Sequence, residues 1–269
     1  MKRRGVPRGV LGAWLLALVV ASALVGPELV PHDPLQPDYR ARFAAPSAEH
    51  WLGTDGLGRD VFARALAGGR VSLVITGAAT LLALGLGLVA GLAAAGFRGP
   101  VDLVLTRAFD ALLAFPGFLL VLLLVAVLGG GVWQTVAALG VAGSPLYFRL
   151  TRAFARQELQ RDYVIAGVAL GAGPVRLLVR HALPNFAGAL AVQAASTAAT
   201  FLLVEASLSY LGLGVPLPTP SWGNVLQDAR AFLTRQPWAA LGPGLVLASA
   251  ALAFQFVADG VRDRLDRRS

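Results

Sequence analysis

Long apolar runs alternate with shorter polar segments along nearly the whole chain. Each run holds about twenty residues with almost no charge, and a helix of that length crosses the hydrocarbon core of a bilayer. The pattern therefore predicts an all-α fold, a polytopic integral membrane protein with six transmembrane helices. The runs are Val10–Val25, Val71–Gly96, Phe109–Leu128, Val132–Phe148, Phe186–Leu211 and Trp238–Val257.

Composition agrees with this interpretation. Of the 269 residues, 56% are hydrophobic and 14% are charged, which is typical of multi-span membrane proteins. The net charge of +8 is explained by charges at membrane boundaries, so no nucleic-acid partner is expected. The chain has no Cys, and His32, His50 and His181 are far apart without ligand spacing, so no metal site is expected.

The first apolar run has two interpretations. Four basic residues precede it and Ala21-Ser22-Ala23 resembles a cleavage site, as in a secretory signal peptide. Because the rest of the chain is also apolar, we favour an uncleaved first span.

The proline-rich segment Pro27–Arg70 separates the first two runs. Proline removes a backbone donor, so this segment cannot be helical throughout and is expected to be an extended external loop. Near its end, Asp60–Leu66 is expected to form a short interfacial helix in which Asp60 and Arg64 pair, four residues apart. Residues 1–70 are thus expected to hold the amino-terminal tail, first span and external loop. Residues 71–269 would form a five-helix core with a cytoplasmic loop over residues 149–187.

Basic residues predict the orientation of the chain. Sixteen of the 23 Lys and Arg lie at the two chain ends, in the second-to-third connection and around Arg161, and seven lie in the two large opposite loops. Because basic residues are retained on the cytoplasmic side, both termini and the Arg161 segment are predicted to be cytoplasmic.

The segment around Arg161 organises the rest of the chain. It reads RDYVIAGVALGAGPVRLLVRHALPN, Arg161–Asn185, and its apolar pieces are too short to cross a bilayer. Asp162 is expected to cap a short helix through Leu170, which Gly171 ends before a second helix over Pro174–Ala182. The first helix is apolar on almost every side and therefore needs a partner. An amphipathic helix lying on the membrane surface is the alternative.

A family resemblance rests on Ala166, Gly171 and the string HALPN, residues 181–185. This pattern resembles the cytoplasmic "EAA" loop of permease subunits in binding-protein-dependent ABC importers. The Glu that names the motif would fall at Ile165, and its second Ala is Gly167. The resemblance implies an ABC type I importer permease fold, whose short helix docks into an ATPase subunit.

Two further strings resemble a narrower group, the permeases of dipeptide, oligopeptide and nickel importers. They are HWLGTDGLGRDVFARALAGGRVSL, residues 50–73, and EASLSYLGLGVPLPTPSWGN, residues 205–224. The group implies peptide translocation across the cytoplasmic (inner) membrane of a prokaryote, with nickel, another chelated metal or an oligosaccharide as alternatives. It also implies a second homologous permease, two ATPase subunits, an external solute-binding protein and membrane lipid as partners. ATP and Mg would belong to the ATPases, and this chain is expected to bind no cofactor.

The sequence itself offers no motif for an enzyme. It contains no G-x-x-x-x-G-K-[ST], no G-x-S-x-G and no H-E-x-x-H, so catalysis by this chain is not expected. A secondary transporter or channel acting alone would need paired intramembrane charges, and only Asp110 and Glu205 are acidic candidates. A scaffold without transport would leave the Arg161 segment unexplained.

The candidate site follows from the resemblance. The face of the helix that would insert into the ATPase consists of Tyr163, Val164, Ile165 and Ala166. Gly171 would permit a bend through which a push on this helix rotates the helices that follow. Glu205 could line the pathway, or it could be hydrogen-bonded to backbone or to the indole of Trp51 or Trp222. Arg149, Arg152 and Arg156 are expected to snorkel toward headgroups. The expected coupling residues are Asp162, Tyr163, Val164, Ile165, Ala166, Gly167, Gly171, His181 and Pro184.

Overall fold

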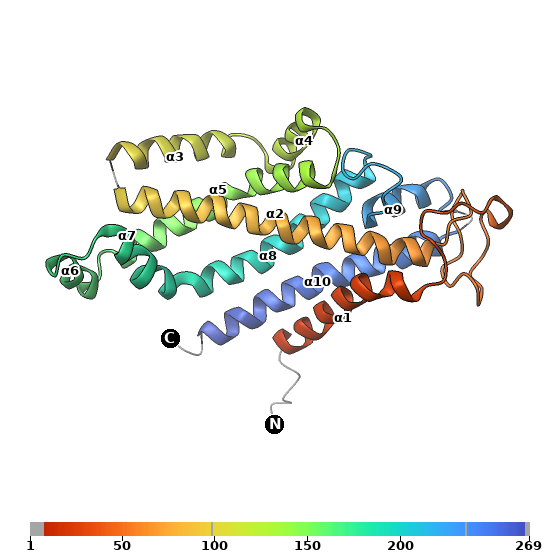
Figure 1. Ribbon diagram of the computed structural model, residues 1–269, viewed down its shortest axis with the longest axis horizontal. Helices are drawn as coiled ribbons and strands as arrows, with labels where there is room; N and C mark the ends of the chain where they lie inside the picture. Colours follow the sequence, from red (N-terminus) through yellow and green to blue (C-terminus); the bar gives the residue numbers. More distant parts are fainter. Residues whose placement is uncertain (1–7, 98, 235, 267–269) are drawn as a thin grey trace, which may run out of the picture.

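The protein is an elongated bundle in which the longest helices run along a common axis (Figure 1). A computed structural model describes residues 8–97, 99–234 and 236–266. In these ranges the regular elements are helices, as predicted. They are α1 (Arg8–Leu29), η1 (Tyr39–Ala41), α2 (Val61–Phe97), α3 (Gly99–Leu113), α4 (Gly117–Leu128), α5 (Val132–Glu158), α6 (Asp162–Ala169), α7 (Pro174–Arg176), η2 (Leu177–Ala182), α8 (Leu183–Tyr210), α9 (Trp222–Arg230) and α10 (Trp238–Asp266).

Helix α2 joins two elements that the sequence analysis separates. Its 37 residues run without a break for about 55 Å, because no proline interrupts them. The expected interfacial helix is therefore the first turns of α2, and the boundary at residue 70 falls inside it. The expected Asp60–Arg64 pair is wrong: Asp60 contacts His50, and Arg64 contacts Asp228.

Helices α2 and α5 pack closely through two glycines. A Cβ atom on Gly91 would lie 2.7 Å from the Thr151 Cβ atom, and one on Gly87 would overlap Tyr147. Glycines spaced four apart are a common means by which membrane helices approach each other. The two glycines of the GxxxG in α2 therefore allow close contact with α5.

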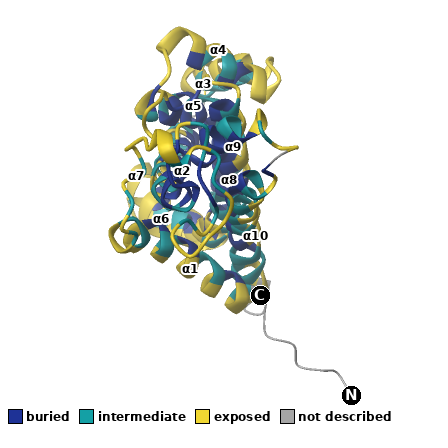
Figure 2. Cartoon of the chain, turned by 90° about the vertical axis from the view of Figure 1, so that its right-hand side faces the viewer, coloured by how far each residue is buried: buried dark blue, intermediate teal, exposed yellow. Residues whose placement is uncertain are grey.

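The third predicted span is not straight. Helices α3 and α4 are bent by 92° at the break before Gly117, where Pro116 cannot continue the helix. Helix α3 also begins at Gly99, earlier than the expected Phe109. Figure 2 shows α3 and α4 at the edge of the molecule, with α4 largely exposed.

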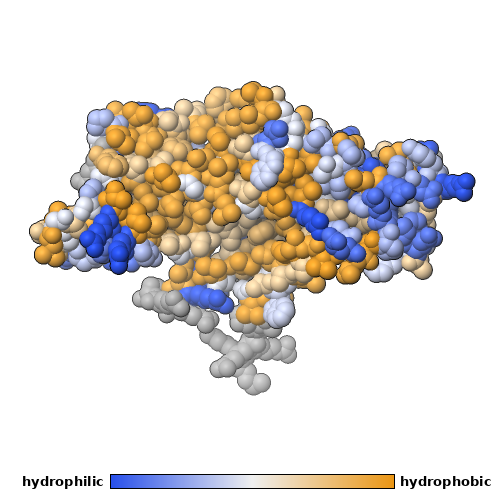
Figure 3. Space-filling model, in the orientation of Figure 1, coloured by the Kyte–Doolittle hydropathy of each residue, from blue (hydrophilic) through white to orange (hydrophobic). Residues whose placement is uncertain are grey.

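Four helical segments are long and apolar enough to cross a membrane, and the bent α3–α4 pair would be a fifth. Helix α5 has 27 residues, about 40 Å, but is less apolar, so the count of six remains a prediction. An apolar band covers the middle of the molecule and gives way to hydrophilic surface at the end opposite α6 (Figures 1 and 3). The four segments are Gly9–Leu29, Val61–Phe97, Pro174–Tyr210 and Trp238–Leu265.

The hydrophilic end opposite α6 is built by the segment between α1 and α2 together with α9 (Figure 1). The extended loop expected over Pro27–Arg70 is instead an irregular segment of turns and bends between α1 and α2, with η1 as a short helical turn, and Pro27 lies within α1. We call residues 30–60 the outer loop. Helix α9 begins at Trp222 after a capping box formed by Ser221 and Asn224. The Trp222 side chain is buried beneath the outer end of α2 and donates its indole N–H to Ala65 O at 2.8 Å.

Candidate functional site

Helix α6 protrudes at one end of the molecule between α5 and α7 (Figure 1). One side of it packs on its own chain: Val164 is 1% exposed, and a Cβ atom on Gly167 would lie 2.9 Å from Leu177 Cδ2. The expectation that Val164 inserts into a partner is therefore corrected. Its side chain attaches α6 to the bundle, because the turn after α5 points it inward.

The other side of α6 presents apolar residues to the surroundings. Ile165 is 57% exposed and Leu170 is 89% exposed, and Ala166 between them is exposed and small. Such apolar surface on and just after a short helix gains stability when protein or lipid covers it. We call the set the α6 ridge: Tyr163, Ile165, Ala166, Val168, Ala169 and Leu170.

The end of α6 is closed by a left-handed residue. Gly171 has φ +82°, a conformation that glycine adopts without strain. Its N–H donates to Val168 O at 2.9 Å, and the N–H of Ala172 donates to Gly167 O at 3.0 Å. This pair of hydrogen bonds is a Schellman motif, which ends the helix sharply. The structure thus places Gly171 at the turn that the sequence predicts.

A polar cluster attaches α6 to its two neighbours, and we call it the latch. Tyr163 donates its hydroxyl to Glu158 Oε2 at 2.7 Å, and Arg161 Nε lies 3.0 Å from Glu158 Oε1. Asn185 Nδ2 donates to the same Glu158 oxygen at 3.1 Å and to the Tyr163 hydroxyl at 2.9 Å. The latch therefore connects the last residue of α5, the first turn of α6 and the first turn of α8.

The contacts within the latch shift the pKa values of the Glu158 carboxyl group and the Tyr163 hydroxyl group. Burial acts to raise the pKa of Glu158, but hydrogen bonds from Tyr163 and Asn185 and the charge of Arg161 outweigh it, so the pKa lies below its usual value. Burial and the adjacent Glu158 carboxylate raise the pKa of Tyr163. Sequence reasoning missed Glu158, although it is the one acid between Arg149 and Arg161.

Three further coupling candidates lie around the latch. Asp162 is the first residue of α6, but the side-chain cap expected of it is not among the described hydrogen bonds, so that expectation is wrong. His181 is exposed in η2, and Pro184 lies in the first turn of α8. Proline at 184 disturbs the preceding turn, where Leu183 N–H reaches Leu178 O in a π-type hydrogen bond. The expected second short helix, Pro174–Ala182, is part of one helical segment that continues through α8 to Tyr210.

The arginines at the end of α5 have specific partners. Arg152 and Arg156 both contact Asp102 of α3, with N–O distances of 2.5 Å. Arg149 contacts Asp110 of the same helix at 2.8 Å. The expectation of simple snorkelling is therefore wrong. These ion pairs fix α3 against α5 beside the base of α6.

Glu205 does not reach the surface. It is fully buried in α8, where it accepts a hydrogen bond from Ser209 Oγ at 2.8 Å. The Trp222 indole N–H is instead donated to Ala65 O. The alternative in which Glu205 binds a tryptophan is therefore wrong. To contact a transported solute, the Glu205 carboxyl group would first have to become exposed by a rearrangement of the helices around it.

Two of the histidines that are far apart in sequence lie close together in the structure. His32, Glu49 and His50 each offer a ligand atom, and these atoms lie within 4.8 Å of one another. Sequence spacing did not reveal the cluster because the outer loop folds back and brings residues far apart in sequence together. It lies in the outer loop, at the other end of the molecule from α6.

Comparison with known proteins agrees with this architecture. The family model described as "Binding-protein-dependent transport system inner membrane component" matches residues 69–269. A di/tripeptide transport system permease protein of Pseudomonas aeruginosa is 39% identical over 96% of this chain and 88% of the relative. A dipeptide transport system permease protein of Alkalihalophilus pseudofirmus is 35% identical, over 96% and 84%. A nickel transport system permease protein of Escherichia coli is 39% identical, over 95% and 92%. With its helical spans and the match over most of its length, the chain belongs to the family of inner membrane components of binding-protein-dependent transport systems.

Proposed function

We propose that this chain is a transmembrane permease subunit of an ABC importer that carries peptides across the cytoplasmic membrane. Relatives named as di/tripeptide and dipeptide permeases match 96% of the chain. The α6 ridge is the observation that carries the mechanism. It is an exposed apolar surface on a short helix that its own chain holds in place.

In this proposal the ridge is inserted into a partner ATPase subunit, with a second ATPase engaging the homologous permease. Val164 and the latch prevent α6 from moving independently of α5 and α8. ATP-driven closure of the ATPases therefore moves α6 together with the helices to which it is fixed. The two permeases then rock and expose the solute path to one side or the other. ATP and Mg are held by the ATPases.

The proposed orientation places α6 and both chain termini in the cytoplasm and the outer loop outside. Sixteen of the 23 basic residues then lie on the cytoplasmic side, as the positive-inside rule favours. In this orientation the outer loop and α9 face the external solute-binding protein, and the apolar band contacts lipid.

A nickel ion or another chelated metal is the second candidate solute. A nickel transport permease is as similar to this chain, at 39% identity, as the di/tripeptide permease is. Uptake by vesicles that contain the assembly and its receptor separates the two, using labelled dipeptide in one arm and radioactive nickel in the other. Uptake of nickel without dipeptide would reject the peptide assignment.

Cysteine crosslinking tests the coupling mechanism directly. The chain has no Cys, so one introduced thiol is the only one it carries. We expect Ile165→Cys to crosslink to a thiol in the copurified ATPase, and Val164→Cys, its buried neighbour, to remain unreacted. Labelling of both positions by a membrane-impermeant reagent from outside intact cells would contradict the proposed orientation. Purification of the intact assembly with Ile165→Cys fully reactive to solvent would contradict docking.

A further inference from the structure

A cluster of metal-ligating side chains lies in the outer loop, far from α6. The loop returns on itself so that the rings of His32 and His50 have centroids 4.7 Å apart. Glu49 precedes His50 and adds a carboxylate, and one ligand atom from each of the three residues lies within 4.8 Å of the others. Two imidazoles and one carboxylate are a common set of protein ligands for a transition metal.

A buried carboxylate orients one of these imidazoles. His50 Nδ1 lies 2.8 Å from Asp60 Oδ2, and Asp60 Oδ1 accepts the Ala63 N–H at 2.6 Å. Asp60 is 4% exposed and is fixed at the start of α2. With Nδ1 engaged by the carboxylate, Nε2 of His50 is available to a metal. Histidine ligands of metals are commonly oriented by such a carboxylate, which fixes the tautomer and ring direction.

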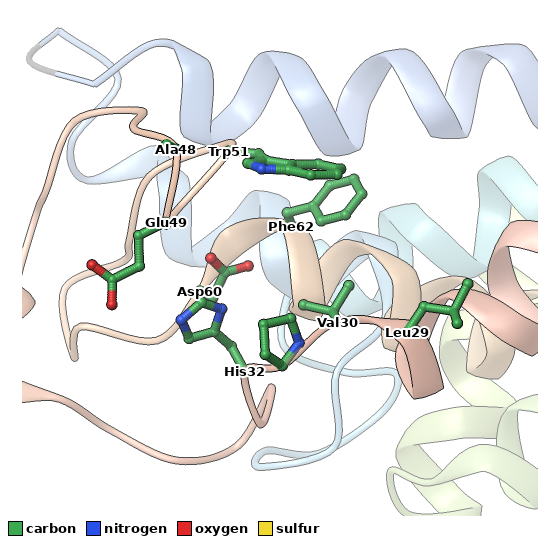
Figure 4. Close-up of a pocket in the computed structure, with 9 residues that line it drawn as sticks. Leu29, Val30, His32, Ala48, Glu49, Trp51, Asp60 and Phe62 are labelled. Carbon is green, nitrogen blue, oxygen red and sulfur yellow. The ribbon is translucent and has the colours of Figure 1, made fainter.

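A cavity of about 430 Å³ adjoins the cluster. Figure 4 shows the side chains of Glu49, His32 and Asp60 at one end of it, while Trp51 and Phe62 form an apolar wall. The cavity leaves space for an ion with water in its remaining coordination positions.

We propose that His32, Glu49 and His50 bind one divalent first-row transition ion of the Zn²⁺ or Ni²⁺ type, with Asp60 as a positioning residue. Bonds of about 2.0–2.2 Å in tetrahedral geometry separate ligand atoms by roughly 3.4 Å. The three ligand atoms lie within 4.8 Å of one another, and the exposed side chain of Glu49 can adjust its position to an ion. Mg²⁺ and Ca²⁺, which prefer oxygen ligands, are excluded by the two imidazoles.

A bound ion would fasten the exit of α1 to the start of α2. His32 follows the end of α1 by three residues, whereas His50 is attached to α2 through Asp60. The ion would therefore cross-link the two stretches of the outer loop that hold His32 and His50. This role does not depend on which solute the importer carries, so it goes beyond the proposed function.

Metal binding by the purified, tag-free assembly tests the proposal without any transport assay. The chelator-treated assembly, without its receptor, is dialysed against Zn²⁺ or Ni²⁺ in excess Mg²⁺, and bound metal is counted by mass spectrometry. We expect the His32→Gln/His50→Gln double variant to bind one ion fewer per copy of this chain. His181→Gln, which changes the remaining histidine, should bind as much metal as the wild type.

Two single variants keep the proposal falsifiable if the double variant folds poorly. Asp60→Asn retains a good helix cap but weakens orientation of His50, so affinity should fall about 10- to 100-fold. Glu49→Gln should weaken binding, whereas Glu28→Gln, an exposed acid at the end of α1, should not. The proposal is overturned if wild type and the double variant bind equal amounts of metal, or if Asp60→Asn and Glu49→Gln bind as tightly as Glu28→Gln.

Discussion

The two polar ends of the molecule differ in how their charged and apolar side chains are arranged. At the outer end, charged groups are paired within the chain: Asp228 of α9 contacts Arg59 at 3.0 Å and Arg64 at 2.7 Å, and Asp55 contacts Arg59 at 2.7 Å. At the α6 end, ion pairs from the end of α5 fix α3, and the latch holds a helix whose other side is apolar and exposed. Both ends therefore contain paired charges, but α6 also presents an exposed apolar ridge.

The proposed docking of the α6 ridge fits this difference. Buried ions that find their counter-charges within the chain need no further protein to satisfy them. Exposed apolar side chains on a fixed helix remain in contact with the solvent, and covering them with another surface is energetically favourable. At the outer end the buried charges are paired within the chain, and in the proposed function an ATPase subunit covers the α6 ridge.

The largest expected effect comes from Ala166→Arg on the α6 ridge. A charged, bulky side chain at the centre of the docking surface should lower transport and transport-coupled ATP hydrolysis at least about 100-fold, a loss of roughly 2.7 kcal/mol of coupling. Membrane insertion and thermal stability should not change, because Ala166 is exposed. Vesicle uptake and ATPase rates measure this effect. Gln157→Arg, which places the same charge on the exposed last turn of α5, is the control. Wild-type uptake by Ala166→Arg would contradict docking of the α6 ridge.

The next largest effect is on stability, at the outer end. Asp228→Ala leaves the fully buried Arg64 guanidinium without its nearest counter-charge, which should destabilise the protein by about 3 kcal/mol. Thermal unfolding of the detergent-solubilised chain measures the loss. Glu28→Ala, which breaks an exposed contact to Arg70, should cost less than about 0.5 kcal/mol. Equal unfolding temperatures for the two variants would show that the outer end is not held by its ion pairs.

A smaller, local effect is expected in the latch. Tyr163→Phe removes the hydroxyl that Glu158 accepts, which should lower the free energy of local opening of α6 by about 1–2 kcal/mol. Hydrogen exchange of the α6 amides measures this opening, and the outer loop serves as an internal reference. Tyr39→Phe, at an exposed position at the other end, is the matched control. Unchanged α6 exchange would mean that Val164 alone holds the helix.

The smallest effect is that of pH on the latch. Because the folded-state pKa of Glu158 is lowered, its contribution is present above its usual pKa of 4.5 and is lost as pH falls through the folded value. The raised pKa of Tyr163 keeps its hydroxyl protonated beyond pH 10.0. Exchange of α6, corrected for intrinsic rates, should therefore be constant between roughly pH 5 and 9 and rise below that window. Glu158→Gln should remove the rise, and a rise near pH 7 would contradict the assignment.

Sequence patterns predicted the features that depend on local chemistry. Helices α1, α2, α8 and α10 follow from apolar runs, and the turn at Gly171 follows from the conformational freedom of glycine. Pro116 explains why the helix breaks before Gly117, but the 92° angle of the break does not follow from the local sequence.

The remaining features depend on which segments become neighbours. Whether Val164 points inward is decided by the turn after α5, and the partners of Arg152 and Arg156 depend on α3 lying beside α5. The cluster of His32 with His50 likewise depends on the path of an irregular loop. A single sequence specifies these residues but does not state how distant segments meet.

The close contact of α2 with α5 restricts how these two helices can move relative to each other. The notches at Gly87 and Gly91 receive the backbone of α5 near Tyr147 and Thr151, so axial slippage of one helix past the other would drive side chains into main chain. In the proposed mechanism α2 and α5 would therefore move together, and because α2 also reaches the outer loop, a displacement begun at α6 would reach a point some 50 Å away as a tilt of the helix pair.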